Sequence, residues 1–580
     1  MFAPIAALTG WRADVAMLLA GALTALALPP VHALPLLLLG IPSLLAALGA
    51  TAGRSRAFRR GWWFGIGLNM VGLYWITEAI LIEAERFWWL VPLAVPALSA
   101  VMALFTGAVA AAARLARPGW QRGFVLAGAW TLTDLARQFI LTGFPWNPIG
   151  SVWEMPGYPG DVMIQPAAAI SVHGLTLATL LLASAPILGW RWRGVALAAL
   201  LLWAGAGVVR LNQPTEGTAP MPKMVVVQGN IPQGQKWNRT LVEGIFNKYL
   251  ALTADGLRQS GPGPAVVLWP ETASPYQLAT DGPAREAIVA VTGAATPLIG
   301  AVRFGADGRP RNTLFALTPS GGISRMFDKW HLVPFGEYQP NWLQVGIQLV
   351  PGGGFAPGPG AVTLDPPGIP PVAPLICYEA IFPGQVVDRT NRPAWMANVT
   401  NDAWFGNSSG PRQHLAAARM RAVEEGLPLV RAANTGISAV FDAYGHEISR
   451  LGMGQTGVLV ETLPRPLPPT PFGRFGLPIP GILALLTVLT GMIGIRSFGR
   501  SPRFTCVFMS MFLFLEKNCR KLRLTLTRRG CGIISSVSCA GTGSCEKRWM
   551  PSKSVSRGRK ADVIVSKNMR VGPWQRLNRL

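Results

Sequence analysis

Hydrophobic and polar residues follow two different patterns along the chain. Up to residue 212, long apolar stretches are separated by short polar or basic segments. These stretches run over Val15–Leu28, Leu34–Ala50, Trp62–Ile82, Phe87–Ala113, Gly123–Ile140, Met163–Leu188 and Val195–Val209, and an eighth runs over Leu477–Ile495. Because ~20 apolar residues cross a bilayer as a helix, the pattern predicts a bundle of about eight transmembrane helices, with seven spans in residues 1–212 and the last in residues 471–496. The first and seventh stretches are short, so they fit either tilted spans or core helices.

Arginine clusters predict the orientation of these helices. Each cluster follows an even-numbered stretch: Arg54, Arg56, Arg59 and Arg60, then Arg114, Arg117 and Arg122, then Arg191 and Arg193. Cytoplasmic loops carry an excess of Lys and Arg, so these loops and the N-terminus are expected in the cytoplasm. The chain then emerges on the outer side after the seventh stretch, and the eighth returns it to the cytoplasm.

Composition indicates a membrane protein and argues against a nucleic-acid partner. Half of the residues are hydrophobic and 14% are charged, whereas soluble chains carry about 25% charged residues. The formal net charge is +24, but 18 Lys and Arg against 3 Asp and Glu lie in residues 497–580. Much of the remaining positive charge lies in short loops between apolar stretches, where membrane orientation requires it.

Between about Pro220 and Thr462 the pattern changes to short runs rich in β-branched residues. They cover Met224–Val227, Val266–Trp269, Leu298–Val302, Thr313–Leu317, Val372–Ile376 and Ile437–Phe441. Helical patterns lie between several of them, notably Thr240–Leu257 and Arg412–Gly426. Strands that alternate with helices predict an α/β layered domain over residues 220–462, and a proline-rich linker then leads back to the membrane. The tail, 497–580, is interpreted as an adventitious extension rather than a functional domain.

Cys377 is the one cysteine in the first 505 residues, whereas the other five lie in the tail. A single thiol cannot build a disulfide framework, and the chain has no CxxC pair for zinc. The five histidines show no metal-ligand spacing, so no metal is expected. A solitary thiol is either a small buried hydrophobe or a nucleophile.

Three residues with candidate chemistry each follow an apolar run. Glu271 comes just after Val266–Trp269, where a carboxylate is either a surface end-cap or a partly buried general base. Lys329 lies in an apolar stretch, where its ammonium either reaches out to solvent or stabilises a developing oxyanion. Cys377 follows Val372–Ile376, and a thiol at a strand-to-helix elbow can present its sulfur to a cleft.

Glu, Lys and Cys in this order, each after an apolar strand, resemble the catalytic set of the nitrilase, or carbon–nitrogen hydrolase, superfamily. Further motifs are similar to its membrane-embedded branch, the apolipoprotein N-acyltransferases. These motifs are Gln228–Gln233 followed by Lys236 and Trp237, Asn401–Gly406, and Gly72–Trp75 in the helical part. The resemblance covers residues 10–496.

This resemblance implies an α-β-β-α sandwich of the nitrilase type, packed on eight transmembrane helices of the cell inner (cytoplasmic) membrane and facing the periplasm. The protein is expected to be a monomer without an organic cofactor. Members of the family move an acyl chain from a phospholipid donor, through a Cys thioester, to the α-amino group of diacylglyceryl-cysteine at the N-terminus of an apolipoprotein.

The same resemblance implies roles for individual residues. Glu271 is expected to be the general base and Cys377 the nucleophile. Lys329, together with the Tyr378 N–H, is expected to stabilise the oxyanion, and Glu337 to orient the lysine. The residues expected to shape the pocket and its mobile loops are Trp237, Tyr378 and Glu379.

Two other functions are compatible with these residues. A membrane-tethered amidase or nitrilase-type hydrolase would pass its acyl group to water, and a small closed pocket would favour it over the lipid-sized lateral opening that transfer requires. A non-catalytic membrane scaffold would keep the fold, although the intact set of Glu271, Lys329 and Cys377 argues against it.

The helical part holds two further features. Asp134 and Arg137, spaced i, i+3, are predicted to form a structural ion pair rather than a proton path. The aromatic, proline-rich loop Thr142–Gly160 is either an interfacial anchor or part of a lipid-binding mouth.

Overall fold

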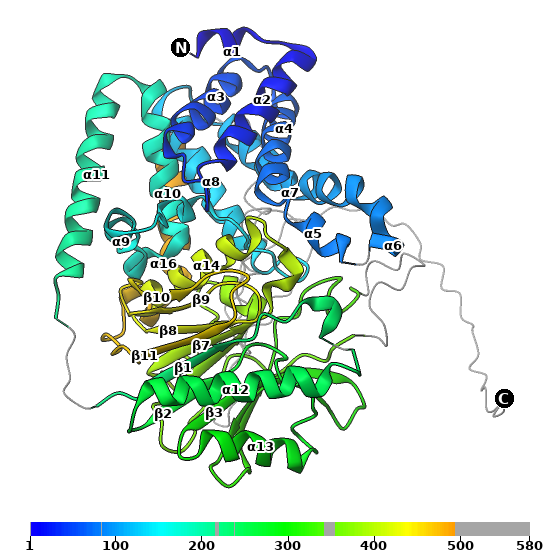
Figure 1. The fold of residues 1–580 in the computed structure, drawn as a ribbon. Coiled ribbons are helices and arrows are strands. Elements are labelled where there is room, and N and C mark those ends of the chain that lie inside the picture. Colours follow the sequence, from blue (N-terminus) through cyan, green and yellow to red (C-terminus); the bar gives the residue numbers. More distant parts are fainter. Residues whose placement is uncertain (1, 83, 215–219, 237, 341–353, 494–580) are drawn as a thin grey trace, which may run out of the picture. The chain divides into compact units, whose positions relative to one another are not determined.

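The chain folds into an N-terminal helical region followed by an α/β region, drawn in Figure 1 in blue to cyan and in green to yellow. The computed structural model describes residues 2–82, 84–214, 220–236, 238–340 and 354–493, all of which belong to the unit Met1–Glu516. The predicted tail, 497–580, the end of the eighth apolar stretch and Trp237 lie outside the described residues.

The helical region is built from apolar helices joined by short turns. Its helices are α1 (Ala3–Ala7), α2 (Gly10–Ala25), α3 (Leu37–Ala50), α4 (Arg54–Gly72), α5 (Ile76–Leu81), α6 (Ala84–Phe87), α7 (Val91–Ala113), α8 (Trp120–Arg137), α9 (Tyr158–Ile164), α10 (Ala167–Leu188) and α11 (Trp190–Leu211). After the α/β region come the short α15 (Pro471–Phe475) and then α16 (Pro478–Met492), which packs against α8 and α10. Helices α2 and α4 approach closely at Gly21 and Gly67, where a Cβ atom would lie 1.9 Å from a main-chain oxygen of the other helix. Small residues permit such close packing between membrane helices.

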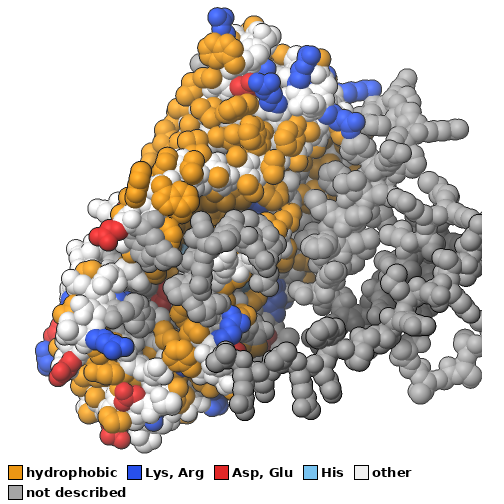
Figure 2. Space-filling model, turned by 90° about the vertical axis from the view of Figure 1, so that its right-hand side faces the viewer, with side chains coloured by type: hydrophobic (Ala, Val, Ile, Leu, Met, Phe, Trp, Pro, Cys, Tyr) orange, Lys and Arg blue, Asp and Glu red, His pale blue; other side chains and the backbone are white. Residues whose placement is uncertain are grey.

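Length, composition and exposure identify a membrane protein. Within the described residues, three helices are long and apolar enough to cross a bilayer: Trp88–Ala113, Ala167–Leu188 and Trp190–Leu211. Helix α11 exposes large apolar side chains, with 76% of Leu202 and 64% of Leu201 accessible. Figure 2 shows hydrophobic side chains spread over much of the helical region, with Lys and Arg gathered at its upper end. Soluble proteins rarely expose apolar patches of this extent.

The helices differ from the predicted stretches in their boundaries. Trp62–Ile82 is divided between the end of α4 and α5, and Met163–Leu188 is divided between α9 and α10. The seventh stretch, which the sequence predicts to be short, belongs to the 22-residue helix α11 because the Trp and Arg residues before it are helical too. Leu34–Ala50 and α16 are apolar but shorter than a span. An apolar stretch in the sequence does not show where a helix begins or ends. Since several stretches are divided or shortened, the described residues show three candidate spans rather than eight.

Within the described residues, the α/β region contains two mixed sheets. Its strands are β1 (Lys223–Gln228), β2 (Ala265–Leu268), β3 (Thr296–Phe304), β4 (Pro310–Leu317), β5 (Ile323–Asp328), β6 (Val372–Ile376), β7 (Trp395–Thr400), β8 (Leu429–Ala433), β9 (Ser438–Phe441), β10 (Glu447–Leu451) and β11 (Gly457–Thr462). The first sheet has the order β11-β1-β2-β3-β4-β5, with β1, β2 and β3 parallel. The second has the order β10-β9-β8-β7-β6, with β6, β7 and β8 parallel. The longer helices of the region are α12 (Val242–Ser260), α13 (Gly282–Thr292) and α14 (Gly410–Glu425).

Alternating side chains of the strands hold the layers together. Met224 and Val226 of β1 pack with Val372 of β6 in a core between the two sheets. Val225 of β1 faces the opposite way and packs with Phe246 of α12. Helix α14 covers the outer face of the second sheet. These contacts give the layers in the order helix, sheet, sheet, helix. Strands buried on both faces consist of continuous apolar runs.

Candidate active site

Residues at the ends of three strands meet in the α/β region. Glu271 follows β2, Lys329 follows β5 and Cys377 follows β6. The ammonium of Lys329 lies 3.5 Å from Glu271 Oε1 and 2.8 Å from Glu337 Oε1. The charges of Glu271 and Lys329 both act on the pKa of Cys377. The structure therefore brings together residues from three segments that are far apart in the sequence: Glu271, Lys329 with Glu337, and Cys377.

The lysine and the two carboxylates form a buried, hydrogen-bonded cluster. Asn312 Nδ2 donates to Glu271 Oε1 at 2.6 Å and to Glu337 Oε1 at 3.4 Å. The main-chain N–H of Asn401 donates to Glu271 Oε2 at 2.7 Å. Burial alone would lower the pKa of Lys329, but the charges of Glu337 and Glu271 outweigh it and raise this pKa above its ordinary value. Lys329 is therefore a permanent cation, suited to stabilising a developing oxyanion.

Cys377 stands on a sharp turn between β6 and a 3₁₀ helix, Cys377–Ile381. Its φ is +52°, a left-handed conformation that is uncommon for a residue with a side chain. Glu379 braces this turn: Oε2 accepts the N–H of Ile376 at 2.6 Å, and Oε1 accepts the N–H of Trp330 at 2.7 Å. One side chain thus joins this turn, residues 376–381, to the segment that carries Lys329; it is called the nucleophile turn below, after the role expected of Cys377. Burial raises the pKa of Glu379 to about 8, against the effect of these hydrogen bonds.

The thiol itself is buried and protonated at rest. Only 7% of Cys377 is exposed. Burial raises the pKa of the thiol, the negative charge of Glu271 raises it further, and Lys329 opposes both. The thiolate is the nucleophilic form of a cysteine, and among the charges that act on the thiol, that of the Glu271 carboxylate has the largest effect.

A second polar network lies beneath the nucleophile turn. His414 Nε2 donates to the main-chain oxygen of Cys377 at 2.9 Å, and His414 Nδ1 lies 3.0 Å from Asp402 Oδ1. Arg431 donates to Asp402 Oδ2 at 2.7 Å. Burial would raise the pKa of Asp402, but Arg431 and His414 bring it down to about 2. The network holds the main chain of Cys377 from the side of α14.

Donor atoms of Cys377, Asp402 and His414 lie within 4.8 Å of one another, a spacing that a metal ion could use. The chemistry of this set does not suit a cation, however. The Asp402 carboxylate already bonds to Thr400, His414 and the Arg431 guanidinium. A fixed positive charge in contact with the carboxylate opposes a second one.

Aromatic residues connect the nucleophile turn with the helical region. The Tyr378 hydroxyl donates to the main-chain oxygen of Gly143 at 2.8 Å. In the same loop, Trp146 Nε1 donates to Gln413 Oε1 at 2.8 Å, and its ring lies 4.7 Å from that of Trp75. The loop Thr142–Gly160 therefore contacts the residue next to Cys377 directly.

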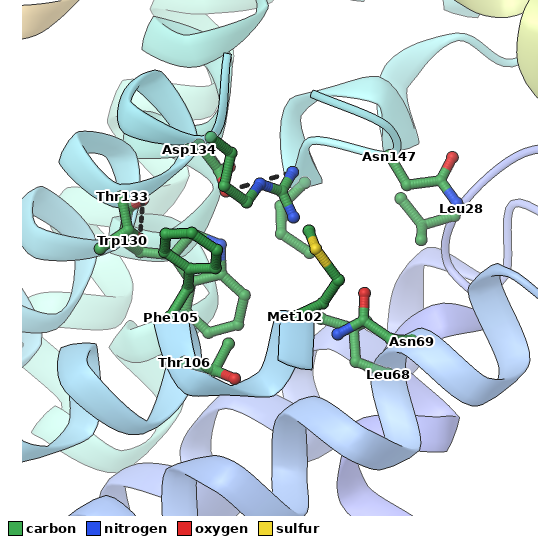
Figure 3. Close-up of a pocket in the computed structure, with 12 residues that line it drawn as sticks. Leu28, Leu68, Asn69, Met102, Phe105, Thr106, Trp130, Thr133, Asp134 and Asn147 are labelled. Atoms are coloured by element: carbon green, nitrogen blue, oxygen red, sulfur yellow. Dashed lines mark hydrogen bonds and ion pairs between the residues drawn. The ribbon is translucent and has the colours of Figure 1, made fainter. Parts of the chain in front are cut away.

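The ion pair that the sequence predicts between Asp134 and Arg137 is confirmed. Arg137 Nη2 lies 3.4 Å from Asp134 Oδ1 and also donates to the main-chain oxygen of Trp146 at 3.0 Å. Both charged residues line a small cavity, in which Figure 3 shows Asp134 pointing toward a guanidinium, with Asn69 and Met102 on other sides. The pair thus ties α8 to the aromatic loop, in keeping with a structural role.

Several of these residues carry no strong sequence signal. Asn312 is a lone amide in a strand, and its position beside Glu271 follows only from the pairing of β3 and β4. Lys236 is buried and donates to the main-chain oxygen of Glu271 at 3.0 Å. The sequence feature that could have pointed to Lys236 is its position directly before Trp237, in a motif similar to one of the family. His414 shows no metal-ligand spacing, and its partner Cys377 lies 37 positions earlier.

Comparisons with known proteins cover both regions. Residues 20–185 match the apolipoprotein N-acyltransferase N-terminal domain, and residues 226–467 match the carbon-nitrogen hydrolase domain. Apolipoprotein N-acyltransferase of Rhodopseudomonas palustris is 40% identical over 83% of this chain and 95% of its own length. That of Brucella suis is 37% identical over 85% of this chain and 97% of its own length. A solved CN-hydrolase superfamily protein from Xanthomonas campestris is 19% identical, with a TM-score of 0.33, over 49% of this chain and 100% of its own. Because its relatives match almost from end to end, this chain belongs to the apolipoprotein N-acyltransferase family.

Proposed function

We propose that this N-acyltransferase moves a fatty acyl chain from a phospholipid, through a thioester on Cys377, to the N-terminal amine of diacylglyceryl-cysteine in apolipoproteins. Acylation of lipoproteins is the activity of its family. The observation that carries the proposed site is the buried cluster of Lys329 with Glu271 and Glu337, beside a thiol on a strained turn.

In the first half-reaction, the Cys377 sulfur attacks the carbonyl carbon of the phospholipid ester while Glu271 takes the thiol proton. The Lys329 ammonium and the Tyr378 N–H stabilise the tetrahedral oxyanion. The intermediate collapses to the thioester, and Glu271 returns the proton to the departing lysophospholipid oxygen.

In the second half-reaction, the neutral amine of the acceptor attacks the thioester carbonyl. Glu271 takes one amine proton and delivers it to the departing sulfur of Cys377, which leaves an amide on the lipoprotein. Glu337 orients Lys329, while Glu379 and Tyr378 hold the nucleophile turn and its contact with the membrane helices. Trp237 is proposed for the pocket from family resemblance alone, because it lies outside the described residues.

Access of lipid is proposed from the side of the helical region. The loop Thr142–Gly160 bonds to Tyr378 and carries Trp146, which packs with Trp75 and Phe405. A loop between membrane helices that contacts the nucleophile turn is suited to form part of a lipid-binding mouth. This contact favours the mouth over a purely interfacial anchor.

The domain organisation is proposed as seven spans in residues 1–212, a catalytic domain at 220–462 and a last span at 471–496, in a monomer of the inner membrane. The three candidate spans and the two shorter apolar helices correspond to five of the eight proposed spans, and the other three are proposed from the apolar stretches Val15–Leu28, Trp62–Ile82 and Gly123–Ile140. Residues 497–580 are proposed to be an adventitious tail without a part in catalysis.

The proposed orientation predicts where the catalytic domain lies. Because the arginine clusters follow even-numbered stretches, residues after the seventh span should be periplasmic. A reporter that requires export, fused after Gln213, should be active, and the same reporter fused after Arg117 should be silent. Activity of a strictly cytoplasmic reporter after Gln213 would overturn the orientation.

The proposed reaction predicts a stable acyl-enzyme. Supplied with phospholipid and no acceptor, the purified protein should accumulate a fatty-acyl mass on the Cys377 peptide, because a dry pocket protects the thioester from water. A diacylglyceryl peptide should discharge this mass, with the acyl chain appearing on its amino terminus, as mass spectrometry of both peptides would show. Rapid release of free fatty acid, without transfer when acceptor is present, would favour the hydrolase instead.

A further inference from the structure

A second buried lysine, Lys236, contacts Glu271. Lys236 follows a short 3₁₀ helix, Gln233–Gln235, and is 5% exposed. Among the described residues, the hydrogen-bond partner of its ammonium is the main-chain oxygen of Glu271, at 3.0 Å. Burying an ammonium group is unfavourable unless the charge is paired and hydrogen-bonded. The contact of Lys236 with the main chain of the proposed general base therefore requires an explanation.

Asn401 joins the loop of Lys236 to the carboxylate of the base. Its side-chain amide donates to Gln233 Oε1 at 2.7 Å, and its main-chain N–H donates to Glu271 Oε2, also at 2.7 Å. Glu271 is followed by Thr272, whose φ is +47°. Lys236 and Asn401 thus hold the main chain and the carboxylate of Glu271 at a point where the backbone is strained.

The two lysines of the site differ in their electrostatic surroundings. Lys329 contacts two carboxylates, which raise its pKa. For Lys236, burial is the largest effect, and the opposing charges of Glu271 and Cys377 leave its pKa at about 8. Lys236 therefore loses its charge as the pH rises through about 8, whereas Lys329 keeps its charge.

Charge balance explains why a second cation is useful. Moving the thiol proton to Glu271 leaves the net charge of the site unchanged, because the thiolate replaces the Glu271 carboxylate. Before and after this step there are two negative groups, one of them Glu337, and Lys329 neutralises only one of the two. A charged Lys236 neutralises the other. In a site this dry, an uncompensated charge is strongly unfavourable.

We propose that Lys236 is a positioning residue for acyl transfer, whose ammonium fixes the main chain of Glu271 and supplies the second positive charge that the two negative groups of the site require. This proposal rests on the proposed function, because it assigns Lys236 a role in forming the same thioester.

The test is the pH dependence of thioester formation in the full chain, measured with phospholipid and no acceptor from pH 6 to pH 10. The wild-type rate should fall above about pH 8 as Lys236 loses its proton. Lys236→Arg, which keeps the charge, should retain the rate at high pH. Lys236→Met should be slower at pH 7 by about tenfold or more, the size of effect expected for one nearby charge in a poorly solvated site, and should lack the fall near pH 8.

Lys248→Met is the matched control, since Lys248 lies on α12 and its ammonium bonds to Thr456 at 3.3 Å, outside the site. It should keep the wild-type rate and pH profile. If Lys236→Met keeps them too, or if Lys236→Arg falls above pH 8 like the wild type, the proposal is wrong. A Lys236→Met protein that unfolds at a lower temperature but forms the thioester normally would likewise reduce Lys236 to a structural residue.

Failure of the proposed function would look different. In that case the wild type itself forms no acyl mass on Cys377, whatever the variants do. Lys236 is then judged from alkylation of Cys377 by iodoacetamide, read on the Cys377 peptide over the same pH range. Slower alkylation of Lys236→Met than of the wild type at pH 7 supports the second-cation role, and equal alkylation rates at every pH overturn it.

Discussion

Replacing Cys377 with alanine should abolish the acyl-enzyme and reduce lipoprotein acylation by a factor on the order of 10⁶, the loss seen when a catalytic nucleophile is removed. The reason is that Cys377 is the free thiol of the described residues and lies on the turn that Glu379 and His414 hold in place. No other group there can form the thioester. The measurement is the yield of N-acylated peptide from phospholipid and a diacylglyceryl peptide.

Cys377→Ser provides the matched control for folding, since it keeps the size and the polar atom of the nucleophile. It should insert and unfold like the wild type but transfer little, because Glu271 must then activate a far weaker acid. The tail cysteines are left in place in all variants: Cys506, Cys519, Cys531, Cys539 and Cys545. An acyl mass on a tail peptide, together with undiminished transfer by Cys377→Ala, would contradict the assignment.

The strands that the sequence predicts correctly are those in which most residues are apolar. β1 and β2 are buried along nearly their whole length, so they stand out as apolar runs. β5 carries Arg325 and Asp328 and is largely exposed, and β7 contains Asn398 and Thr400 although every residue of it is buried. Their assignment depends on pairing with distant strands, which a local pattern does not contain.

The same reasoning separates the predicted parts of the site from the missed ones. Glu271, Lys329 and Cys377 each follow a recognisable strand or motif. His414 lies on α14, a helix that is buried on almost every side although it contains arginines and glutamates. Several of its polar side chains are paired with partners far away in the sequence, as in the bond between Ser171 Oγ and Glu424 at 2.8 Å. A hydrophobic pattern predicts such a helix to be exposed on its polar face.

Replacing Lys329 with methionine should lower the rate of thioester formation by about 10²–10³, the usual cost of removing one donor to an oxyanion. The ammonium lies 2.8 Å from Glu337 and 3.5 Å from Glu271, and it is 1% exposed. Its loss removes the cation that faces the developing negative charge. The measurement is the single-turnover rate of acylation of Cys377, compared with the temperature of unfolding.

Stability and catalysis must be separated in this variant, because Lys329→Met leaves two buried carboxylates facing each other, at a cost of roughly 3–5 kcal/mol. The double variant Lys329→Met/Glu337→Gln removes one of these charges and keeps an amide that can bond to Asn312 and the Val333 N–H, the present partners of Glu337. It should unfold at a higher temperature than Lys329→Met while remaining about 10² or more slower than the wild type. If the rate recovers together with the stability, Lys329 serves the fold of the site and not the oxyanion, and the stabilising donor must be sought elsewhere.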